Sequence, residues 1–76
     1  MKIAEIKPRS NFMLQVTTDD GRIGTFDVSP YLHLEAFSEL INIDEFMKIK
    51  NGKYFVEWEC GADLSSDTIE AYLKLV

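Results

Sequence analysis

One set of residues in the chain has the types needed for nucleophilic catalysis, namely Cys60, His33 and Asp63. A thiol becomes a nucleophile when an imidazole takes its proton, and a carboxylate commonly holds that imidazole in place. The only histidine lies between Leu32 and Leu34, however, and no motif brings it to Cys60. A single cysteine shortly after a tryptophan is more typical of a small buried apolar side chain. We therefore predict that the protein is not an enzyme.

Two pairs of adjacent carboxylates, Asp19 with Asp20 and Asp44 with Glu45, could bind a hard cation. Neither pair continues into the alternating oxygen ligands of a calcium loop. A transition-metal site would need several histidines or cysteines, and the chain has one of each. Turn and helix-cap roles explain both pairs, so the sequence predicts neither a metal nor another cofactor.

The elements that would position these residues meet around Gly61. Residues 54–59 alternate in the period-2 manner of a strand, with Tyr54, Val56 and Trp58 on one face. This pattern makes Trp58 a core residue. Gly61 follows as the residue best able to adopt a positive φ, so we predict that the chain reverses there.

Asp63 has two interpretations. Its carboxylate can accept hydrogen bonds from backbone N–H groups of the turn or of the following helix, which we favour. Alternatively, it lies beside Trp58 at the mouth of a small groove and contacts a partner. Trp58, Gly61 and Asp63 are thus the candidate residues for a structural turn or an interaction site.

A C-terminal helix is predicted after this turn, with Ser65 or Asp67 as its N-cap. Such a helix needs a sheet against which to bury its apolar stripe. The stripe has positions i, i+3, i+4 and i+7, occupied by Ile69, Tyr72, Leu73 and Val76.

Two dipeptides that end in glycine predict tight hairpins. Asp-Gly and Asn-Gly favour two-residue type I′ turns, which require positive φ at both central positions. The predicted pairs are residues 11–18 with 22–28 across Asp20-Gly21, and residues 48–50 with 53–58 across Asn51-Gly52.

A first strand over residues 2–7, with Ala4 and Ile6 on its inner face, is predicted to end at Pro8 because proline cannot donate to a ladder. Two short helices, over residues 35–40 and 44–47, would bridge the hairpins. The fold class is therefore α+β, with an antiparallel sheet of two hairpins plus the N-terminal strand and the C-terminal helix packed on the sheet.

Composition places the 76 residues in a single domain, 1–76, of a soluble protein. No apolar run approaches the ~20 residues of a membrane helix. The N-terminus lacks the apolar segment of a signal peptide, and one cysteine cannot form an internal disulfide. These features predict a cytoplasmic location.

The charge balance argues against direct nucleic-acid binding. Thirteen acidic and eight basic residues give a net charge of −5, the wrong sign for a phosphate-neutralising surface. Lys48, Lys50 and Lys53 form a local exception, which is most simply a solvated edge that discourages strand pairing.

Aromatic residues offer a further possibility for binding. Tyr31, Tyr54 and Trp58 could anchor an interface, although burial in a small core is the simpler explanation. Because so small a fold cannot cover all of its aromatic surface, a protein partner or a homodimer is plausible.

The order Trp58, Gly61-Ala62-Asp63-Leu64 and Thr68-Ile69 resembles the bacterial domain-of-unknown-function family numbered 2442, whose hallmark is Trp-x-x-Gly-x-Asp before a capped helix. Cys60 stands where the family usually has a small polar residue, and Ser66 where it has proline. The resemblance covers nearly the whole chain and also includes Asp20-Gly21, residues 26–30 and Phe46.

This resemblance implies a fold and a typical gene neighbourhood rather than a reaction. The resemblance implies that genes of this family often lie beside the gene of a second small protein, and that some members are fused to a helix-turn-helix. We therefore expect a non-catalytic protein-interaction module, the partner of a neighbouring-gene product in a toxin–antitoxin-like or regulatory pair. The alternative is a transcription-associated regulator that reaches DNA only through a helix-turn-helix partner. Either reading expects no direct nucleic-acid, membrane or known small-molecule ligand.

Overall fold

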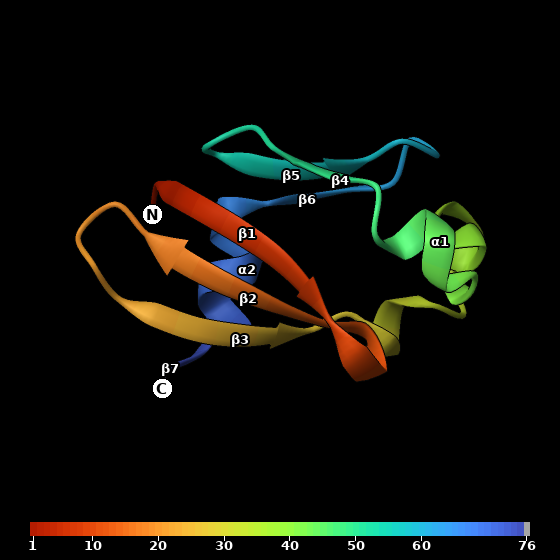
Figure 1. The fold of residues 1–76 in the computed structure, drawn as a ribbon, viewed down its shortest axis with the longest axis horizontal. Coiled ribbons are helices and arrows are strands. Elements are labelled where there is room, and N and C mark those ends of the chain that lie inside the picture. Colours follow the sequence, from red (N-terminus) through yellow and green to blue (C-terminus); the bar gives the residue numbers. More distant parts are fainter. Residues whose placement is uncertain (76) are drawn as a thin grey trace.

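The computed structural model describes residues 1–75, whose strands form two antiparallel sheets connected by short helices (Figure 1). The larger sheet has the order β1-β2-β3-β7, and the smaller has the order β4-β5-β6. The strands are β1 (Ile3–Arg9), β2 (Met13–Thr18), β3 (Ile23–Asp27), β4 (Ile49–Asn51), β5 (Phe55–Trp58), β6 (Asp63–Ser65) and β7 (Lys74–Leu75). The helices are η1 (Ser10–Phe12), η2 (Ser29–Tyr31), η3 (Glu35–Ile41), α1 (Ile43–Phe46) and α2 (Ser66–Tyr72).

The predicted α+β class is confirmed, with antiparallel hairpins and a C-terminal helix. The hairpins do not join into one sheet, however: among the described residues, β1 hydrogen-bonds to the β4–β5 hairpin only through its first residue. There Ile3 donates its N–H to the carbonyl of Lys53 over 2.7 Å and accepts from the side chain of Asn51 over 2.9 Å. In Figure 1 the smaller sheet lies above the larger one, with α1 at one end of both.

The core lies where the inner faces of the two sheets and the helices meet. Alternation along β2 buries Leu14 and Val16, as predicted. The fully covered core comprises Ile3, Leu14, Val16, Phe26, Val28, Leu40, Phe46, Val56, Trp58 and Ile69, each at most 1% exposed.

Strand β1 differs from its prediction in length and in facing. It runs through Pro8, which pairs with Leu14, because β1 is an edge strand and the missing N–H faces away from the ladder. Ile3 is buried while Ala4 is exposed, since the register shifts between Ile3 and Glu5 and changes which residues face inward. The predicted inward placement of Ala4 is therefore wrong.

The β2–β3 hairpin forms where predicted, but its turn has three residues, 19–21, rather than two. The N–H of Gly21 donates to the carbonyl of Thr18 over 3.1 Å, and the N–H of Thr18 donates to that of Arg22 over 2.9 Å. Only the glycine has a positive φ, +91°, so the turn is a three-residue loop with glycine in its last position instead of type I′.

The β4–β5 hairpin also differs in its turn. The positive φ, 72°, falls on Lys53 rather than on Gly52. Gly52 is needed instead for close packing, because an added Cβ would lie 2.3 Å from the ring of Phe55. Tyr54 belongs to this turn rather than to β5 and is 62% exposed, so its predicted place in the core is wrong.

The bridging segment is helical as predicted, although η3 is a 3₁₀-helix, which buries Phe37 and Leu40 at i, i+3. Asn42 caps α1 by accepting from the N–H of Asp44 over 3.0 Å. None of the helices within residues 1–75 is long and apolar enough to cross a membrane.

The C-terminal helix α2 begins at its predicted cap, Ser65, which accepts from the N–H of Thr68 over 3.1 Å. It ends at Tyr72, and the chain then becomes extended and forms β7 beside β3. Tyr72 is 70% exposed, so it is not part of the predicted buried stripe. Val76, the last residue of that stripe, lies outside the described residues.

Candidate functional site

Trp58 is the core anchor that the sequence predicts. It is 1% exposed, and its Nε1 donates to the carbonyl of Phe46 over 2.9 Å. The indole also packs edge-on against Phe37, with ring centroids 6.2 Å apart. Because the Trp58 side chain is buried, it fixes the start of the β5–β6 turn to the core, and its ring is not accessible to a partner.

Gly61 has the predicted positive φ, +100°, at the end of the turn that joins β5 to β6. Asp63 begins β6, pairs with Glu57 and is exposed. Within residues 1–75 its carboxylate accepts no hydrogen bond, and Ser65 provides the cap of α2. The capping role predicted for Asp63 is therefore not observed, and its carboxylate faces solvent.

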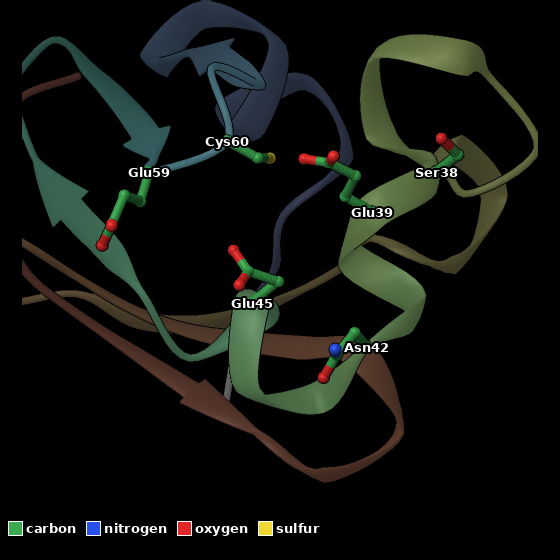
Figure 2. A pocket seen from close by; sticks show the side chains of 6 residues that line it. All are labelled: Ser38, Glu39, Asn42, Glu45, Glu59 and Cys60. Carbon is green, nitrogen blue, oxygen red and sulfur yellow. The ribbon is translucent and has the colours of Figure 1, made fainter.

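The pocket beside this turn contains Cys60 and has a volume of about 500 Å³ (Figure 2). Figure 2 shows the Cys60 thiol and the Glu39 carboxylate pointing toward each other, with Glu45 directed into the same space and Glu59 directed away. Cys60 is partly exposed rather than buried as predicted. The pocket is lined by Ser38, Glu39, Asn42, Glu45, Glu59 and Cys60.

The surroundings of Cys60 do not reproduce the nucleophile, base and orienter set. Neither His33 nor Asp63 lines its pocket, whose ionisable neighbours are carboxylates. Reactive thiols lie in electropositive surroundings, because the thiolate is the nucleophile. The three residues weighed as a nucleophile, base and orienter are thus not brought together around Cys60.

The carboxylates of this pocket are already partly engaged. Glu45 forms an ion pair with Lys48 at 3.2 Å. The hydrogen bond to Glu45, and then the charges of Glu45 and Glu59, raise the pKa of Lys48 above its ordinary value. No group of three or more potential metal ligands is close enough to hold an ion within the described part of the chain.

A second concave surface lies between the end of β3 and the end of α2, with a volume of about 490 Å³. We call it the tyrosine groove. Tyr31 stacks on Phe26 with ring centroids 5.9 Å apart, while Tyr72 reaches the groove from the other side. The groove is lined by Phe26, Asp27, Pro30, Tyr31, Tyr72 and Lys74.

Local sequence features build both walls of this groove. Asp27 accepts from the N–H of Ser29 over 2.9 Å, and Pro30 lies in the first turn of η2, which together place Tyr31. On the other side, β7 can lie beside β3 only because residue 24 is glycine. A Cβ there would be 2.7 Å from Leu73. The sequence did not predict the groove, because helical spacing assigned Tyr72 to the core.

Comparisons with known proteins identify the family. No curated protein and no solved structure matches the chain. The sequence model of the family described as "Protein of unknown function (DUF2442)" matches residues 3–74. This match covers nearly all of both sheets, the Cys60 pocket and the tyrosine groove, and it confirms the resemblance to this family. The chain therefore belongs to the DUF2442 family of proteins of unknown function.

Proposed function

We propose that this chain is a non-catalytic protein-interaction module whose binding surface is the tyrosine groove. The observation that carries the proposal is the exposure of Tyr72, at 70%, beside a groove with further aromatic residues in its walls. Tyrosine is among the residue types that contribute most to binding energy at interfaces. An apolar pocket with a few polar groups is also the usual form of a binding site.

The opposite wall of the groove is rigid, which favours binding. Tyr31 is held by stacking on Phe26 and by a tilted contact with Phe37, with centroids 5.6 Å apart. An aromatic side chain fixed before binding loses little conformational entropy when a partner packs against it. Such a surface suits a protein side chain or short segment.

For the partner, we propose the product of a neighbouring gene in a toxin–antitoxin-like or regulatory pair. The support comes from the gene neighbourhood that the family resemblance implies, and no contact in this chain is used for it. The net charge of −5 favours a basic partner, since opposite charges raise the rate of encounter.

The absence of catalysis is also part of the proposal. Cys60 shares its pocket with Glu39, Glu45 and Glu59 and not with His33, the base that a thiol nucleophile would need. The acidic pocket thus gives no reason to assign a reaction to the chain.

The proposal is tested by expressing the chain together with its neighbouring gene product and measuring their affinity by calorimetry. Tyr72→Ser should weaken binding by about tenfold or more, because it removes an exposed aromatic anchor. The matched control is Tyr54→Ser, which removes a tyrosine of similar exposure, 62%, from the far hairpin. That control should bind as the unmodified chain does.

Two results would contradict this reading. Failure of the unmodified chain to bind the neighbouring product would remove the proposed partner. Loss of binding in Asp63→Ala, with Tyr72→Ser unaffected, would move the interface to the β5–β6 turn. Circular dichroism of each variant shows that the fold is retained, which is expected because all three side chains are exposed.

A further inference from the structure

The backbone beside the end of β3 is covered by this chain itself. Lys74 of β7 pairs with Thr25, and Leu73 leads into that pairing. Strand β3 then ends at Asp27. A ligand therefore finds no free strand edge to extend at this point, and the tyrosine groove recognises it through side chains.

The side chains that line the groove offer more hydrogen-bond donors than acceptors. The hydroxyls of Tyr31 and Tyr72 donate as well as accept, and the Lys74 ammonium only donates. Within residues 1–75, neither hydroxyl forms a hydrogen bond and Lys74 forms no ion pair. Asp27 is the one carboxylate among the lining residues, and its Oδ1 already accepts from the N–H of Ser29. The groove thus suits a ligand with many acceptors and few N–H donors.

The charges of the lining residues restrict what can lie between the two tyrosine rings. Lys74 would repel a cationic side chain enclosed there, and Asp27 would repel an anionic one. The side chain between Tyr31 and Tyr72 is therefore uncharged, and the aromatic walls favour an apolar one. Because Asp27 forms no ion pair within the described part of the chain, a basic residue next to the apolar one can pair with it.

Proline meets both requirements. Its ring is apolar and rigid, its carbonyl accepts hydrogen bonds and it has no N–H. Segments rich in proline adopt the polyproline II conformation, which has no internal hydrogen bonds and leaves its carbonyls free for outside donors. Such segments dock in aromatic-lined grooves, and they lose little conformational entropy because the helix exists before binding.

We propose that the tyrosine groove binds a proline-containing segment of the partner protein in the polyproline II conformation. A proline ring lies between Tyr31 and Tyr72, and an adjacent basic residue of the segment pairs with Asp27. The two tyrosine hydroxyls and the Lys74 ammonium donate to carbonyls of the segment. This inference rests on the proposed function and specifies what the groove recognises. The basic residue agrees with the net charge of −5, which favours a basic partner.

Three blocked hexapeptides test this proposal, with the sequences Arg-Ala-Pro-Pro-Ala-Arg, Arg-Ala-Ala-Ala-Ala-Arg and Glu-Ala-Pro-Pro-Ala-Glu. The second lacks proline, the third has the opposite charge, and the repeated end residue lets each segment lie in either direction. Each is titrated into the full ¹⁵N-labelled chain, and chemical shifts report the affinity and the residues affected. The first peptide should shift the amides of Tyr31, Tyr72 and Lys74 and bind about fivefold or more tightly than either of the others.

Variants separate the parts of the site. Tyr72→Ser should weaken binding of the first peptide about tenfold. Tyr72→Phe keeps the ring and removes only the hydroxyl, so it should weaken binding about threefold. The matched control Tyr54→Ser should leave the affinity unchanged. Asp27→Asn should remove the preference for the first peptide over the third, and it keeps the side-chain oxygen that accepts from the N–H of Ser29.

The remaining outcomes overturn the inference in distinguishable ways. If the neighbouring product binds through Tyr72 while the first peptide shifts no amide of the groove, the interaction module stands and proline recognition is wrong. If the first and second peptides bind equally, proline is not the residue recognised. If the first and third bind equally to the unmodified chain, the pairing with Asp27 is wrong. If the same amides shift on concentrating the chain alone, with a dimer by light scattering, the occupant is a second copy rather than a partner segment.

Discussion

The turns of the β2–β3 and β5–β6 hairpins share one backbone hydrogen-bond pattern but are stabilised differently. In each, a glycine N–H donates to a carbonyl three residues earlier, Gly21 to Thr18 over 3.1 Å and Gly61 to Trp58 over 2.9 Å. Both glycines have positive φ, +91° and +100°. The first turn spans residues 19–21 and the second spans residues 59–61.

The first turn is held by its own polar side chains. The Thr18 hydroxyl accepts from the N–H of Arg22 over 3.0 Å and donates to Asp20. Asp20 forms an ion pair with Arg22 at 3.1 Å, and Arg22 also reaches Glu70 at 3.7 Å. The polar groups of this turn are thus used within the structure.

The second turn is fixed to the core by the buried Trp58, whose indole N–H donates to the carbonyl of Phe46. Its own side chains are therefore not needed to maintain the backbone, and Glu59 and Cys60 line the pocket of Figure 2 instead. The comparison teaches that a turn with this hydrogen-bond pattern needs no polar side-chain bonds of its own where a buried, hydrogen-bonded residue holds its first position.

The largest expected effect comes from the core support of the second turn. Trp58→Phe removes the indole N–H, leaves the carbonyl of Phe46 without its partner and creates a cavity, so it should destabilise the fold by about 2–4 kcal/mol. In the first turn, Thr18→Val should cost about 1–2 kcal/mol. Urea denaturation measures both. An equal or larger loss for Thr18→Val would invert the comparison.

Replacing the glycine by alanine should lower the free energy of unfolding by the same amount in the two turns. An alanine Cβ at Gly21 or Gly61 would have no atom within 4 Å, so only the positive φ opposes substitution. Gly21→Ala and Gly61→Ala should each destabilise by about 1–2 kcal/mol. Thermal unfolding of the two variants measures this. A difference between them well above ~0.5 kcal/mol would show that the turns are not equivalent in backbone strain.

The smallest effect concerns acid stability of the first turn. Hydrogen bonds from Thr18 and then from Arg22 lower the pKa of Asp20 below its ordinary value of 3.8. A lowered folded-state pKa stabilises above the unfolded value and is lost as the pH falls through the folded value. Asp20→Asn should therefore lower the melting temperature slightly at pH 7, and the difference should shrink below about pH 3.8. A difference that persists unchanged in strong acid would contradict this origin.

Local features explain how much of the fold the sequence predicts. Two glycine-containing dipeptides located the β2–β3 and β4–β5 turns, Gly61 located the reversal after β5, and Ser65 marked the start of α2, because these preferences act within a few residues. The turn types were wrong, since the third residue of each loop depends on strand register rather than on the dipeptide. The facing of β1 was wrong for a related reason, the register shift after Ile3.

The candidate site depended on contacts between distant segments. Helical spacing placed Tyr72 in the core, yet the helix ends there because the chain turns to pair with β3, over Gly24. That pairing leaves Tyr72 exposed and Asp27 beyond the part of β3 that β7 covers. Neither result is visible in the residues around position 72 or around position 27 taken separately.

The sequence by itself determined the α+β class, the family, the reversal at Gly61 and the burial of Trp58, because alternation and glycine conformation are local properties. The tertiary structure alone decided that the strands divide into two sheets and that the tyrosine groove forms between β3 and α2. Packing decides these features because a side chain becomes exposed or buried according to which distant element covers it.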